Sequence, residues 1–158
     1  MQELHTAASV QQQTVAMMPQ PRGSEMAPEH ERSPECQYKP RALVVDDSAD
    51  IAFMLAMILR HAGYNALMAT SAADALDAAR QEHFDVVISD IGMPEMDGYA
   101  LAEALRALPD CRNVPMIAVT GFDEYDNCDR ALAAGFNAHM KKPIDVPSFI
   151  RLIRTLSR

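Results

Sequence analysis

The sequence predicts an α/β domain with a doubly wound, five-stranded parallel sheet. Short apolar runs rich in β-branched residues recur along the chain, and stretches with helical periodicity separate them. The apolar runs are continuous, as is typical of parallel strands that are covered on both faces. Regular alternation of strands and helices predicts right-handed crossovers, with helices on both sides of one sheet.

Five strands and five helices are expected in alternation. The apolar runs that predict strands are residues 42–45, 66–68, 86–88, 116–119 and 138–140. Helical periodicity covers residues 51–59, 72–79, 101–108 and 149–156, and a shorter helix is expected over 126–134. The first helix is expected to bury Ile51, Met54, Leu55, Ile58 and Leu59. Ser71 with Asp74 forms a capping-box pair, and Asp145 is the expected N-cap of the last helix.

The first 38 residues differ in composition from the rest of the chain. They contain four prolines, a glutamine run and five Glu against two Arg, but few large apolar side chains. Such a segment buries too little apolar surface to offset the entropy of ordering. We therefore expect a disordered tail over residues 1–38 and a single domain over residues 39–158.

Composition excludes several classes of function. With 22 acidic and 14 basic residues, the formal charge is −8, which argues against nucleic acids and anionic membranes as partners. No apolar run reaches the roughly 18 residues of a spanning helix, and no secretory signal begins the chain. The three cysteines (Cys36, Cys111 and Cys128) match neither a disulfide framework nor a zinc site. These features favour the cytoplasm.

Polar residues gather where the predicted strands end. Asp46 and Asp47 follow the first strand, Asp90 the third, Thr120 the fourth, and Lys142 the fifth. The carboxyl ends of parallel strands share one edge of a sheet, where ligands bind in such folds. Carboxylate oxygens suit Mg²⁺, which commonly binds carboxylates together with a phosphate. A cation and a lysine would let a phosphoryl group approach, and a carboxylate is a known nucleophile for it. Charge alone does not show which carboxylate attacks.

Four motifs at these strand ends resemble the receiver domains of two-component response regulators, the CheY-like family. They are residues 44–48 (VVDDS), 90–98 (DIGMPEMDG), 118–121 (AVTG) and 142–143 (KP). Their order and spacing match the family, and the resemblance covers about residues 40–157. It implies a five-stranded sheet with strand order 2-1-3-4-5.

The resemblance also implies a phosphorylation site that contains magnesium. Asp90 would be the phosphoacceptor and one of the Mg²⁺ ligands. Asp47 would bind the ion directly, Asp46 through water, and Gly92 through its carbonyl oxygen. These roles are what the resemblance implies for each matching position.

Further positions would bind the phosphoryl group or switch with it. Thr120 and the Gly121 N–H would hold phosphoryl oxygens, and Lys142 would pair with them, next to a cis bond to Pro143. Thr120 and His139 would move on phosphorylation. The family often has Tyr or Phe in place of His139, and a histidine there leaves pH-sensitive switching open.

The sequence therefore predicts a stand-alone phosphoacceptor or a phosphorelay intermediate. A sensor histidine kinase or a histidine phosphotransfer protein would donate the phosphoryl group, and a downstream protein would read the state. We expect weak autophosphorylation and autodephosphorylation only, and so no enzyme in the usual sense. Two alternatives stay open: a phosphorylation-independent interaction module, and a Mg²⁺-dependent phosphatase or phosphotransferase.

Overall fold

The computed structural model describes residues 38–121 and 128–157. The predicted tail, except for Tyr38, lies outside the described residues, as do residues 126 and 127 at the predicted start of the fourth helix. No helix within these two ranges is long and apolar enough to cross a membrane.

The described residues form the predicted doubly wound fold. The strands are β1 (Arg41–Val45), β2 (Asn65–Ala69), β3 (Val86–Asp90), β4 (Met116–Thr120) and β5 (Ala138–Lys141). All pair in parallel, in the order β2-β1-β3-β4-β5. The helices are α1 (Ala49–His61), α2 (Ala72–Gln81), α3 (Gly98–Ala107), α4 (Cys128–Ala134) and α5 (Val146–Leu156), with a short 3-10 turn over Pro109–Cys111. The predicted fold class and strand order are confirmed.

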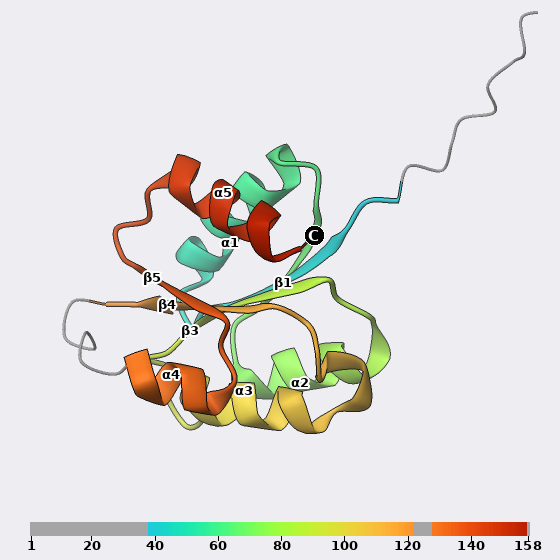
Figure 1. Ribbon diagram of the computed structural model, residues 1–158, viewed down its shortest axis with the longest axis vertical. Helices are drawn as coiled ribbons and strands as arrows, with labels where there is room; N and C mark the ends of the chain where they lie inside the picture. The colour runs from blue at the N-terminus through green and yellow to red at the C-terminus, as the bar shows by residue number, and fades with distance from the viewer. Residues whose placement is uncertain (1–37, 122–127, 158) are drawn as a thin grey trace, which may run out of the picture. The chain divides into compact units, whose positions relative to one another are not determined.

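Two hydrophobic clusters fill the space on either side of the sheet. Figure 1 shows α1 and α5 over one face and α2, α3 and α4 over the other. The central strands β3 and β4 are buried along their whole length, as continuous apolar runs require. The edge strand β2 leaves Leu67 and Met68 partly exposed.

The apolar stripe of α1 differs from the prediction. Met54 is 46% exposed, and the buried residues of the helix are Ala52, Leu55, Ala56 and Leu59. This set has the same i, i+3, i+4, i+7 spacing, shifted by one residue, and it shares Leu55 and Leu59 with the predicted stripe. Ile51 and Ile58 are partly buried and pack against the core, as predicted. The two alanines of the buried set face the sheet, and the larger side chain of Met54 lies outside the core.

Helix caps follow the predicted signals where the loops meet the helices. The Ser71 hydroxyl accepts a hydrogen bond from the Asp74 N–H, and the Asp145 carboxylate accepts one from the Ser148 N–H. Asp97 caps α3 in the same way by accepting from the Ala100 N–H. These bonds satisfy donors that a helix N-terminus leaves unpaired.

Candidate functional site

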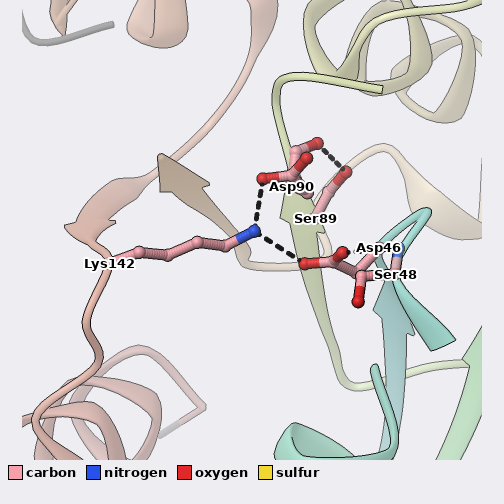
Figure 2. Close-up of polar contacts among 5 residues, drawn as sticks. All are labelled: Asp46, Ser48, Ser89, Asp90 and Lys142. Carbon is pink, nitrogen blue, oxygen red and sulfur yellow. Dashed lines mark hydrogen bonds and ion pairs between the residues drawn. The ribbon is translucent and has the colours of Figure 1, made fainter. Parts of the chain in front are cut away.

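Lys142 joins two of the predicted carboxylates at the carboxyl edge of the sheet. Its Nζ donates to Asp46 Oδ2 and to Asp90 Oδ1, each at 2.8 Å (Figure 2). Asp46 follows β1, Asp90 ends β3, and Lys142 follows β5, so the contacts bring together residues from three strands. Asp46 and Asp90 are only 1% and 6% exposed, which makes these ion pairs largely shielded from water.

Asp47 completes a group of three carboxylates. One oxygen each from Asp46, Asp47 and Asp90 lies within 4.8 Å of the others, and Asp47 is exposed to solvent. Oxygens that bind one Mg²⁺ at about 2.1 Å lie at most about 4.2 Å apart, so small side-chain movements suffice to bind the ion. Three carboxylates and one ammonium group carry a net charge of −2, which one Mg²⁺ cancels. The residues therefore fit a magnesium ion.

Burial and charge shift the protonation of this cluster. Burial raises the pKa of the Asp90 carboxyl, and the charges of Asp46 and Asp47 add to the rise; Lys142 opposes it without cancelling it. Burial also disfavours the charged form of Lys142, but its hydrogen bonds to Asp46 and Asp90 outweigh burial and raise the pKa of the ammonium group. Lys142 thus stays charged, and additional positive charge at the site would favour the ionised form of Asp90.

Backbone hydrogen bonds hold each strand end beside its neighbour. The Asp46 N–H donates to Ala69 O at 3.2 Å, and the Lys142 N–H donates to Thr120 O at 2.8 Å. The Ser48 N–H donates to Asp46 Oδ1 at 2.9 Å, which leaves the other carboxylate oxygen to Lys142 (Figure 2). The Ser89 hydroxyl donates to the carbonyl oxygen of Asp90 at 2.8 Å. The chain therefore positions these carboxylates before any ligand arrives.

Other predicted residues lie around this cluster. Thr120 ends β4 and is 6% exposed, and Gly121 follows it directly. Gly92 is exposed on the loop after β3, and the peptide bond between Lys142 and Pro143 is cis. The roles of Thr120, Gly92 and Gly121 remain predictions.

His139 lies outside the carboxylate cluster. Its side chain is exposed on β5, and its ring nitrogens contact Cys128 Sγ on α4 at 3.3 and 3.4 Å. The structure therefore shows the predicted switch residue on the α4–β5 surface. Its role in switching remains a prediction.

Sequence reasoning missed the parts played by Ser89 and Gly98. Ser89 sits within a buried strand and gives no signal of its own in the sequence. Gly98 would be taken for an ordinary turn glycine, yet it packs against the backbone of Asp90. The family motif that contains Gly98 was the one available signal.

Comparison with known proteins agrees with this geometry. The family model for the response regulator receiver domain matches residues 42–154. The chain belongs to this family. Over 113 residues it is 32% identical to the polar-differentiation response regulator DivK of Brucella ovis, which spans 72% of this chain and 92% of that protein.

Solved receiver structures share the fold. The chemotaxis response regulator CheY4 of Vibrio cholerae superposes with a TM-score of 0.71 at 28% identity, over 75% of this chain and 99% of that one. The receiver domain of the sensor histidine kinase PA1611 from Pseudomonas aeruginosa gives a TM-score of 0.69 at 25% identity, over 76% and 98%. That domain has a magnesium ion coordinated in its active-site cleft.

Proposed function

We propose that this receiver domain accepts a phosphoryl group on Asp90 from a phosphohistidine donor and signals through protein binding. The observation that carries the proposal is the placement of Asp90, buried beside two carboxylates and paired with Lys142. A buried carboxylate among like charges is unfavourable by itself, and such perturbed groups gather at functional sites.

The second carboxylate oxygen of Asp90 is the proposed nucleophile. Oδ1 is bonded to Lys142, whereas Oδ2 accepts no hydrogen bond from the residues that the structure describes. In the transfer, an Asp90 oxygen forms a bond to phosphorus while the bond from phosphorus to the donor's imidazole nitrogen breaks. The imidazole leaves with the bonding electrons, and an acyl phosphate remains on Asp90.

Positive charge makes this approach possible. Magnesium, held by Asp46, Asp47, Asp90 and the Gly92 carbonyl, would neutralise phosphoryl oxygens as charge develops on them. Lys142 already spans two carboxylates, so its ammonium group lies near the incoming oxygens. Thr120 ends β4 at the same edge and Gly121 follows it, and we assign the remaining phosphoryl oxygens to the Thr120 hydroxyl and the Gly121 N–H.

The proposed output is a shift between two conformations, read by a downstream protein. The Lys142 N–H is bonded to Thr120 O, so the strand end that carries the lysine is tied to the proposed switch residue. Relatives such as DivK and CheY4 match over 92% and 99% of their length, so they consist of little more than this domain. This supports a regulator that acts by binding, or a phosphorelay intermediate, rather than a conventional enzyme.

An exposed apolar surface lies on the helix that follows Asp47. The helix α1 starts two residues after Asp47 and exposes Phe53, Met54 and Met57, which are 53%, 46% and 36% exposed. Exposed apolar groups of this size favour a protein partner. We assign this surface to the histidine kinase or phosphotransfer protein, and we expect both proteins in the cytoplasm.

Incubation with acetyl phosphate tests the proposal without a protein donor. With Mg²⁺, intact-mass measurement should find one phosphoryl adduct, which disappears with EDTA and in Asp90→Asn. An adduct that survives this substitution would place the chemistry elsewhere. Absence of any adduct would favour the phosphorylation-independent interaction module. Steady turnover of small phosphate esters would favour the phosphatase.

A further inference from the structure

A cysteine on α4 and a histidine on β5 lie in contact. Cys128 is the first residue of α4, and its Sγ contacts the ring of His139 on β5 at 3.3 Å from Nδ1 and 3.4 Å from Nε2. Both side chains are exposed to solvent. The phosphoryl chemistry proposed for Asp90 does not use Cys128.

The contact places a proton acceptor next to the thiol. A neutral imidazole carries its proton on one nitrogen and leaves the other as an acceptor. Because Sγ is nearly equidistant from the two nitrogens, it faces the ring and lies off the in-plane lone pair of each, so the exposed ring must turn to aim its acceptor nitrogen at the thiol. A nucleophile and a base within hydrogen-bond reach are the two parts that activated cysteines require.

We propose that Cys128 is a modification site that forms a reversible mixed disulfide with a low-molecular-weight disulfide such as oxidised glutathione, with His139 as the proton acceptor. The thiol proton passes to His139, and the Cys128 sulfur attacks one sulfur of the small disulfide. The bond between its two sulfurs breaks as the new S–S bond forms. The departing thiolate takes up the proton and leaves as a thiol. The sulfur of Cys128 is thereby oxidised to a mixed disulfide, and the departing sulfur of the small disulfide is reduced.

Cys111 provides an internal comparison. It is 1% exposed, and burial, with a smaller contribution from the charge of Asp110, raises the pKa of its thiol. Both properties slow its reaction, because the thiolate is the nucleophile and must reach the disulfide. The two cysteines in the described residues therefore differ in access and in their neighbours.

The adduct would add bulk to the α4–β5 surface beside the predicted switch residue. The proposal itself rests on the contact between Cys128 and His139, and it does not depend on phosphorylation of Asp90. Its failure would leave the phosphoacceptor function untouched, since the two experiments measure different adducts.

The test uses the full chain with Cys36→Ser, so that Cys111 and Cys128 are the remaining thiols. Folded protein is incubated with oxidised glutathione and followed by intact mass and peptide mapping. We expect one adduct, located on Cys128, released by dithiothreitol and absent in Cys128→Ser. Its rate should fall about tenfold or more in His139→Gln. It should not change in His61→Gln, which alters an exposed histidine on α1.

The same chain unfolded in urea gives the rate of an unassisted thiol. The folded protein should exceed this rate at Cys128 and fall below it at Cys111. Equal rates for the folded and unfolded chains at Cys128 would overturn the proposal, even if a histidine variant failed to fold. An adduct on Cys111, or an unchanged rate in a folded His139→Gln variant, would overturn it as well.

Discussion

Gly98 lies against the backbone of Asp90 with no room for a side chain. A Cβ at Gly98 would come within 2.3 Å of the Asp90 carbonyl oxygen and 2.7 Å of Ile91 Cα. The Gly98 N–H also donates to Ile91 O at 2.9 Å. The atoms in the way belong to the backbone, so no flexible side chain can move aside. The start of α3 therefore packs directly on the segment that carries the proposed phosphoacceptor.

Gly98→Ala is expected to lower the free energy of unfolding by about 1–3 kcal/mol, because the backbone must shift to admit a methyl group. Phosphorylation by acetyl phosphate should slow with it, since the shift displaces Asp90. Urea denaturation measures the first effect. Gly121→Ala is the matched control for stability, since no atom of the described residues beyond its chain neighbours lies within 4 Å of its added Cβ. Equal losses in the two variants would refute the contact.

Asp90→Asn is expected to stabilise the protein at neutral pH in buffer without Mg²⁺. Folding raises the pKa of this carboxyl, mainly by burial, so the folded chain holds the proton more readily than the unfolded chain. The ordinary pKa of this carboxyl is 3.8. As the pH rises from there through the raised pKa of the folded chain, the free energy of unfolding of the parent falls relative to that of the variant, and the difference persists at higher pH. Urea denaturation of both proteins across this pH range measures the difference. A difference that does not change with pH would contradict the assignment.

Arg106 ties the α3 helix to the segments before β4 and β5. Its guanidinium donates to the carbonyl oxygens of Cys111, Arg112, Val114 and Gly135, and to Asn137 Oδ1. Arg106→Lys should lower the free energy of unfolding by about 2–4 kcal/mol, because an ammonium group cannot reach these acceptors together.

The exposed pair of Arg80 and Asp77 offers a control, and Arg80→Lys should change the free energy of unfolding by less than about 0.5 kcal/mol. Similar losses in both variants would argue against the network.

Phe53→Glu should slow phosphoryl transfer from a phosphorylated histidine phosphotransfer domain by roughly tenfold or more, since a charge would replace an apolar side chain in the proposed interface. Transfer from acetyl phosphate should not change, because Phe53 is 53% exposed and belongs to the surface of α1. Leu132→Glu changes a similarly exposed residue on α4 and should leave both rates unaltered. Slower transfer from both donors would indicate damage to the site itself.

The sequence predicts the gathering of Asp46, Asp90 and Lys142 at one edge because chain order fixes where the strands end. Asp46, Asp90 and Lys142 follow buried apolar runs, and parallel pairing brings such ends to one edge. The network of Arg106 has no comparable signal, since its acceptors are mostly backbone carbonyls, which every residue carries. The contact between Cys128 and His139 likewise depends on how α4 packs beside β5.

The choice of buried face on α1 shows another limit of sequence patterns. The stripes that begin at Ile51 and at Ala52 have the same period and share Leu55 and Leu59. In the sequence, the larger apolar residues of the stripe that begins at Ile51 make it the expected buried face. The structure instead buries Ala52 and Ala56 and exposes Met54. Close approach of the helix to the sheet favours small residues, and the sequence alone does not report that distance.

Reduction with borohydride most directly tests whether Asp90 is the phosphoacceptor. Borohydride converts an acyl phosphate to an alcohol, so a phosphorylated aspartate becomes homoserine, which peptide mass spectrometry can locate. After treatment with acetyl phosphate and Mg²⁺, homoserine should appear at position 90 and be absent when EDTA is added. Homoserine at position 46 or 47, or the same yield at position 90 with EDTA, would contradict the account.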